Sequence, residues 1–203
     1  MSNYLIINDH RIELTEEQVQ QIIAAHNTGI PTIKLADIEE GNSFMIGVHE
    51  FIVLEQSGDT TAIIRKDLLP DQEFGRTNNY HDSAVDKTCC KFADEIATII
   101  GAENIVEHTV DLTSDDGLKD YGTIQSRCSL LTADLYRRYI DILDKFNPDS
   151  WWWLATPHST KRHENDNWVK CVSPSGCIDF YHYGLVDGVR PFLILKSTIF
   201  VSK

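Results

Sequence analysis

Three consecutive tryptophans, Trp151, Trp152 and Trp153, constrain the fold more than any other feature of the sequence. Successive side chains of a β-strand point to opposite faces, so three adjacent indole rings cannot all enter one core. At least one ring must pack on a second layer or lie at the surface. We expect the domain to be closed around this segment by the apolar run from Gly188 to Leu195, near the C-terminus.

A chain of 203 residues fits one domain of generous size, or one domain with a small appendage. Its apolar share of 42% is ordinary, and no apolar run approaches the roughly 18 residues that span a membrane. The first residues lack the basic and apolar regions of a signal peptide. We therefore expect a cytoplasmic protein without a membrane partner.

The five cysteines are an odd number in a chain without a signal peptide, which predicts reduced thiols. Cys171 and Cys177 flank a predicted turn and could approach each other. We interpret them as small packing residues rather than as a disulfide or a metal pair.

The net charge of −13 is concentrated in residues 1–146, which carry 26 acids and 12 Lys or Arg. Residues 147–203 hold the other five acids and six basic residues. Because Lys and Arg drive binding to phosphates, direct contact with nucleic acid is not expected. The acidic surface can attract a basic protein partner or can serve solubility alone, and both interpretations stay open.

Residues 1–33 are predicted to form a small unit of one hairpin and one helix. Two short strands around a turn at residues 8–10 precede Thr15, which has capping-box spacing with Gln18. The helix that follows should end near Asn27. Such a unit is too small to hold a core by itself, so we expect it to dock on the main domain or on a second copy.

Residues 34–203 are predicted to form one α+β domain. Apolar periodicity and turn residues indicate strands over 42–48, 49–55, 60–65, 109–112, 127–131, 151–155, 168–172, 177–180 and 189–195. Helices are expected over 84–100, capped by Asp82 or Ser83 and stopped by Gly101, and over 133–146, capped by Thr132. We expect the 189–195 strand to pair with the strands of 42–54.

Several ordered motifs in residues 34–203 resemble an uncharacterised domain family of phage, prophage and bacterial proteins. The motifs are Gly41 to Leu54, Asp116-Gly117-Leu118-Lys119-Asp120-Tyr121-Gly122, Trp152 to Pro157, Val172 to Ile178, and Gly188-Val189-Arg190-Pro191-Phe192-Leu193. The resemblance implies a C-type-lectin-like fold, a small twisted antiparallel sheet flanked by helices. Ala155 replaces the arginine of the family's WWLRSP segment, and Ser173-Pro174-Ser175-Gly176 replaces its SDG turn.

Candidate catalytic and metal sites are weak in this sequence. It contains no Gly-rich phosphate loop, nucleophile elbow or zinc-protease pair, and His158, His163 and His182 follow no ligand spacing. Glu164 to Asn167 offer side-chain oxygens beside Trp168, but too few for a calcium ion that takes six to eight. We therefore expect no enzyme, no metal and no cofactor.

Arg190 lies between apolar residues of the closing strand. A buried guanidinium needs acceptors or an aromatic face, so we expect Arg190 to stack on a tryptophan and to bond backbone carbonyls. Together with Trp152 and Trp153, it is predicted to be structural.

The family resemblance and the acidic N-terminal portion favour a non-enzymatic binding module of phage or prophage origin that acts in the cytoplasm of a bacterial host. It would act by protein–protein contact, for example as an anti-defence or anti-CRISPR protein whose acidic face occupies a basic nucleic-acid channel. The alternative is a carbohydrate-binding, lectin-like module of a phage particle. The expected contact residues are Glu16, Glu17, Glu39, Glu40, Asp115 and Asp116 for the first function, and Glu164, Asp166 and Trp168 for the second.

Overall fold

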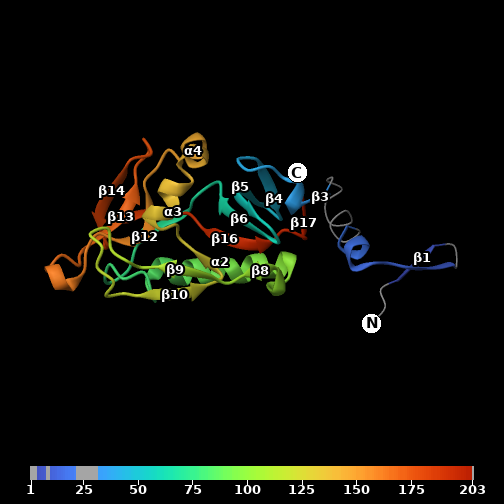
Figure 1. Cartoon of the computed structure of the whole chain (residues 1–203), viewed down its shortest axis with the longest axis horizontal. Coiled ribbons are helices and arrows are strands. Elements are labelled where there is room, and N and C mark those ends of the chain that lie inside the picture. The colour runs from blue at the N-terminus through green and yellow to red at the C-terminus, as the bar shows by residue number, and fades with distance from the viewer. Residues whose placement is uncertain (1–3, 8–9, 22–31, 203) are drawn as a thin grey trace.

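The computed structural model describes residues 4–7, 10–21 and 32–202. It shows an α+β protein in which most neighbouring strands run antiparallel (Figure 1). One sheet curls into a half-barrel, and a second, smaller sheet lies beside it, with a few short helices and one long one. The α+β class predicted from the sequence is confirmed.

The larger sheet contains β3 (Thr32–Lys34), β4 (Ser43–Ile46), β5 (His49–Ser57), β6 (Thr60–Arg65), β8 (Ile105–Val106), β11 (Cys128–Ser129), β16 (Phe192–Lys196) and β17 (Phe200–Ser202). The smaller sheet contains β7 (Leu69–Glu73), β12 (Trp152–Pro157), β13 (Trp168–Val172), β14 (Ile178–His182) and β15 (Val186–Val189). Two separate pairs are β1 (Tyr4–Ile7) with β2 (His10–Glu13), and β9 (His108–Asp111) with β10 (Thr123–Ser126). The helices are α2 (Ala84–Ile100), α3 (Ala133–Arg138), α4 (Ile140–Leu143) and the short η1 (Leu35–Asp37), η2 (Ala102–Asn104), η3 (Asp144–Phe146) and η4 (Lys161–His163). None of the described helices combines the length and apolar character that a membrane crossing requires.

The strand order is β11-β16-β6-β5-β4-β17-β3 in the larger sheet, with β8 also on β16, and β14-β13-β12-β15-β7 in the smaller one. Strand β5 is buried on both faces from Phe51 to Leu54. Because its side chains alternate, Phe51 and Val53 enter a larger core, whereas Ile52 and Leu54 enter a smaller one. The central strands of the half-barrel therefore serve two apolar layers.

The tryptophan run is divided between these layers, as the alternation of strand side chains predicts. Trp153 is fully buried in the larger core, with its ring centroid 5.6 Å from that of Phe74. Trp152 is fully buried in the smaller core against Tyr136, also at 5.6 Å. Trp151 is half-buried and stacks on Tyr181 at 4.5 Å.

Helix α2 has the limits that its sequence predicts. The Ser83 hydroxyl accepts a hydrogen bond from the Asp86 amide at 3.1 Å, which supplies the N-cap. Gly101 ends the helix with a φ of 86°, a value that a residue with a side chain rarely adopts. Along its apolar face Val85, Cys89, Phe92 and Ile96 are buried. Ile100 is half-buried against the larger core, whereas Ile99 is exposed.

The prediction of a single helix over 133–146 is wrong, because α3 ends at Arg138 and α4 begins at Ile140. Tyr139 lies between them with φ −102° and ψ 16°, outside the helical region. Its hydroxyl donates a hydrogen bond to Glu55 of β5 at 2.5 Å, so a contact distant in sequence accompanies the bend.

The closing strand expected over 189–195 is two strands in different sheets. β15 ends at Val189, and β16 begins at Phe192. Pro191 between them has no amide proton for a sheet hydrogen bond, which favours a break at this point. The expected pairing with the strands of 42–54 is also wrong, because β16 pairs with β6, and it is β17 that reaches β4.

The N-terminal unit contains the predicted hairpin and the start of a helix over residues 16–21. The capping box is confirmed: the Thr15 amide donates to Gln18 Oε1 at 3.0 Å, and the Gln18 amide donates to Thr15 Oγ1 at 3.2 Å. The predicted helix end near Asn27 and most of the turn at residues 8–10 lie outside the described residues. The division between residues 33 and 34 stays a prediction.

Candidate binding surface

One face of the smaller sheet is covered at one end only. Strands β13 and β14 place Trp168 opposite His182 and Lys170 opposite Phe180. One pair further along, Val172 belongs to the smaller core that the residues of α3 and α4 complete. Phe180, by contrast, is 40% exposed. The end of the sheet away from these helices is therefore open.

Aromatic rings line this open end. His158 stacks on Phe180 with ring centroids 4.4 Å apart and an interplanar angle of 21°. Trp168 stands edge-on to Phe180 at 5.6 Å and to His182 at 5.8 Å, with interplanar angles of 83° and 90°. We call His158, Trp168, Phe180 and His182 the aromatic surface. Such rings combine a large apolar area with polar atoms at the edge, which suits recognition of another molecule.

Charged side chains linked by ion pairs pack beside the aromatic surface. Lys170 Nζ lies 3.2 Å from Asp115 Oδ2 and 5.5 Å from the ring centroid of Phe180, and the Lys170 side chain is only 8% exposed. Asp115 Oδ1 accepts a hydrogen bond from Arg137 of α3 at 3.1 Å. Desolvation raises the pKa of Asp115, but the hydrogen bonds and charges of Arg137 and Lys170 outweigh it, so this pKa is lowered. The ion pairs join β13, α3 and the segment before β10.

Two loops border the aromatic surface: the DG loop, residues 112–122, between β9 and β10, and the outer loop, residues 158–167, between β12 and β13. The Asp116 carboxylate fastens them together. It accepts hydrogen bonds from the hydroxyl of Ser159 at 2.6 Å and from that of Ser114 at 2.5 Å, and its Oδ2 lies 2.9 Å from His163 Nδ1. Desolvation raises the pKa of Asp116, but these hydrogen bonds together have the larger, opposite effect. The pKa of Asp116 is therefore well below its ordinary value.

Further polar contacts also join the outer loop to the rest of the fold. Asp120 accepts a hydrogen bond from the Thr160 hydroxyl at 2.6 Å and pairs with Arg162. The buried amide of Asn78 donates to the carbonyls of Ser159 at 2.8 Å and Trp168 at 3.1 Å. The outer loop, polar and without periodicity in the sequence, is thus held by side-chain hydrogen bonds.

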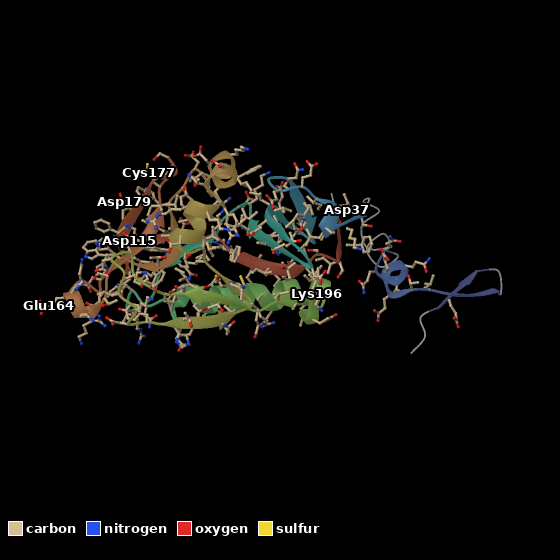
Figure 2. All side chains as sticks on the ribbon, in the orientation of Figure 1. Asp37, Asp115, Glu164, Cys177, Asp179 and Lys196 are labelled. Atoms are coloured by element: carbon tan, nitrogen blue, oxygen red, sulfur yellow. The ribbon has the colours of Figure 1, made fainter. Side chains whose placement is uncertain are left out.

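The structure brings together residues that the sequence assigned to different functions. Asp115, in the DG loop, and Glu164, in the outer loop, lie at the same end of the molecule, whereas Asp37 and Lys196 lie toward the other end (Figure 2). The six acids expected to contact a protein are all exposed residues, but they do not form one surface. Three of them, Glu40, Asp115 and Asp116, use their carboxylates in hydrogen bonds or ion pairs within the fold.

Among the residues proposed for sugar binding, Glu164 is exposed with a left-handed backbone, φ 53°, and Asp166 and Trp168 are half-buried. The described part of the chain holds no group of three His, Cys, Asp or Glu that could bind a metal ion. Of the three histidines without ligand spacing, His163 is exposed, whereas His158 and His182 are half-buried within the aromatic surface.

Phe180 and Lys170 were missed by the sequence interpretation. Their signal is the period-two pattern of the two strands, which places Trp168 and Lys170 on one face of β13, and Phe180 and His182 on the same face of β14.

Arg190 has the contacts predicted from its apolar neighbours. Its side chain is fully buried, with Nε donating to the Arg65 carbonyl at 3.0 Å and Nη2 to the carbonyls of Phe146 at 2.8 Å and Lys66 at 3.3 Å. Its Cζ lies 5.1 Å from the ring centroid of Trp152. Burial lowers the pKa of Arg190 to about 10, so it stays a cation at neutral pH.

The five cysteines are free thiols. Cys171 is buried in the larger core, and desolvation followed by the charge of Asp187 raises the pKa of this thiol well above its ordinary value. Cys177 is exposed and directly precedes β14. Of the two cysteines predicted to be packing residues, Cys171 is one and Cys177 is not.

A cleft of about 730 Å³ lies away from the aromatic surface, between helix 16–21, the C-terminal end of α2 and β17. Its lining includes Ile99, Phe200 and Lys196. Figure 2 places Lys196 at the end of the body opposite Asp115. The cleft and the aromatic surface are therefore separate features.

No family model, curated protein or solved structure matches this chain.

Proposed function

We propose that this chain is a non-enzymatic binding module and that the aromatic surface contacts a protein partner. The observation that carries the proposal is the cluster of half-buried rings around the exposed Phe180, together with the ion pairs of Asp115 with Lys170 and Arg137 beside it. Aromatic side chains supply much of the free energy of binding at protein interfaces, because they bury a large area and lose little conformational entropy.

The orientation of the rings supports a protein rather than a sugar as the ligand. Trp168 stands perpendicular to Phe180 and His182, so the rings form ridges instead of one flat platform. Ridges and hollows suit the side chains of a protein partner, whereas a sugar ring stacks on a flat aromatic face. The carbohydrate module, centred on Trp168, is the alternative outcome of the test below.

The charge of the chain supports a basic partner. The formal net charge is −13. The outer loop itself holds two acids, Glu164 and Asp166, and two bases, Lys161 and Arg162, so the charge that favours a basic partner belongs to the chain as a whole. Opposite charges on two proteins increase the rate at which they associate. The proposed partner is therefore a protein with a basic surface, such as the nucleic-acid channel of a bacterial immune effector.

The proposal includes a phage or prophage origin and a C-type-lectin-like fold, both from the family resemblance of residues 34–203. One feature that supports the fold is the pairing of β17 with β3 and β4, which puts the first and last strands of residues 32–202 side by side. The loops that border the aromatic surface then correspond to the long loops in which lectin-like proteins bind their ligands.

The first test compares the purified wild-type chain with Phe180→Ala and Trp168→Ala, using Val48→Ala as a matched control. Val48 is 84% exposed at the turn between β4 and β5, so its loss also removes an exposed apolar side chain. A bacterial protein captured by cross-linking is purified, and its affinity for each variant is measured by calorimetry. We expect a loss of about tenfold or more for the two aromatic variants and none for the control. Equal affinity for all four proteins contradicts the proposal.

The second test separates the protein ligand from the sugar. Reversing Glu164 and Asp166 to Lys should slow association with the basic protein, and high salt should reduce this effect, because the attraction is screened. Reversing Glu16, Glu17 and Glu39 is the distant control. Binding to a glycan array that requires Trp168, together with thermal stabilisation by calcium, would establish the carbohydrate module instead.

A further inference from the structure

The N-terminal hairpin lacks the neighbours that a stable sheet needs. Strands β1 and β2 pair antiparallel, with Tyr4 opposite Glu13 and Ile7 opposite His10. Within the described residues they form a sheet of their own and join no other strand. In Figure 1, β1 projects away from the body of the molecule. An isolated two-stranded hairpin is marginally stable in water, so pairing with a further strand would stabilise it.

The composition of β1 indicates which edge is unprotected. Its four residues, Tyr4 to Ile7, are all apolar by sequence. Edge strands in monomeric proteins usually carry charges that prevent pairing with another chain. Strand β2 has such charges at Arg11 and Glu13, and β1 has none.

The local charge permits two copies to meet at this point. Residues 4–13 contain two acids, Asp9 and Glu13, and one base, Arg11, a net charge of −1, whereas the chain as a whole carries −13. Two such acidic molecules repel each other over most of their surfaces. The hairpin carries only a small part of this charge, so repulsion between two copies is weak there.

We propose that β1 pairs edge to edge with β1 of a second copy of this chain, so that two hairpins form one four-stranded antiparallel sheet. A two-fold axis relates the copies, which places the Tyr4 end of one strand beside the Ile7 end of its partner. The outer edges of the new sheet are then the two β2 strands. Their charged residues, Arg11 and Glu13, prevent the addition of further copies, so the product is a dimer.

The test measures the association state of the full chain by sedimentation velocity over a wide range of concentrations. Ile6→Lys places a charge in β1 and should give a monomer with an unchanged melting temperature of the body. Two controls add the same charge elsewhere: Gln20→Lys on the N-terminal helix, and Val48→Lys on the exposed apolar turn of the body. Both controls and the wild type should remain dimers, and higher salt should tighten the dimer by screening the repulsion.

Hydrogen exchange of the wild-type chain gives a result that does not depend on any variant. The amides of β1 should exchange more slowly as the protein concentration rises, because a second copy covers them. A wild-type monomer at all concentrations overturns the proposal. So does a dimer that persists in Ile6→Lys, or one lost in Val48→Lys but kept in Ile6→Lys, since the interface would then lie on the body.

Discussion

Arg190 is a cation that the fold buries completely, and its contacts show what it does there. Its guanidinium donates hydrogen bonds to the carbonyl of Arg65, the last residue of β6, to that of Lys66, and to that of Phe146, the last residue of η3. It also lies over Trp152, the ring that enters the smaller core. One side chain therefore connects the crossing between the two sheets to the tryptophan segment.

Replacing Arg190 by alanine should lower the free energy of unfolding by about 3 kcal/mol or more. Three carbonyls lose their donor, each at a cost of about 1–3 kcal/mol, and the removed side chain leaves a cavity against Trp152. Urea unfolding followed by circular dichroism measures the change, with Arg76→Ala, at an exposed arginine, as the control. A variant as stable as the wild type, but unable to bind a partner, would assign Arg190 to recognition instead.

Asp187 should make stability depend on pH. It is 6% exposed, and its Oδ2 has no hydrogen-bond partner among the described residues. Desolvation, followed by the charge of Asp71, raises its pKa from the ordinary 3.8 to about 6. The folded state therefore holds this proton more tightly than the unfolded state, so stability falls as pH rises from 3.8 to about 6 and stays lower above it.

Asp187→Asn removes the free-energy cost of burying an ionised carboxylate. It should raise the free energy of unfolding by up to about 2 kcal/mol near neutral pH and leave it unchanged at about pH 3.5. The measurement is thermal unfolding of both proteins over this pH range. Asp59→Asn, at the turn between β5 and β6, removes the same charge from an exposed position and should give no such pH-dependent gain. A gain that is the same at every pH would locate the effect in packing rather than in ionisation.

At the scale of the elements, the aromatic surface depends on the contact between the DG loop and the outer loop. Asp116 accepts hydrogen bonds from Ser114 and Ser159 and lies beside His163, so one carboxylate orders both loops. The outer loop leads directly into β13, where Trp168 begins the strand. Order in the loop therefore helps to position the ring.

Asp116→Asn should loosen the outer loop, because an amide cannot accept all of these hydrogen bonds at once. We expect faster hydrogen exchange over residues 158–163 and a loss of stability of about 1 kcal/mol. Asp59→Asn again serves as the charge-matched control, with unchanged exchange in these residues. Full protection of the outer loop in Asp116→Asn would show that the amide of Asn78 is sufficient to hold it.

At the scale of the whole molecule, the two proposed contact surfaces lie at different places. The aromatic surface is at the end marked by Asp115 and Glu164 in Figure 2, and the hairpin is at the N-terminal end in Figure 1. A dimer joined through the hairpins leaves both aromatic surfaces accessible. Such a dimer binds a target with two sites more tightly than one copy does, because the second contact is made within the same complex.

The sequence by itself determined the elements whose limits depend on neighbouring residues. Ser83 and Gly101 bound α2 where predicted, because capping and positive φ involve only adjacent backbone groups. The capping box of Thr15 and the extent of β13 have the same local origin. The division of the tryptophan run between two layers also follows from strand alternation alone.

Only the tertiary structure decided which strands pair and which loops meet. The partner of β16, the break of the helix at Tyr139 and the contact between Asp116 and Ser159 each join segments far apart in the chain. Such contacts depend on how the whole chain packs, and no local pattern distinguishes β6 from β4 as the neighbour of an apolar strand. The period-two pattern indicates which side chains of β13 and β14 share a face, but only the tertiary structure adds the two distant loops that complete the aromatic surface.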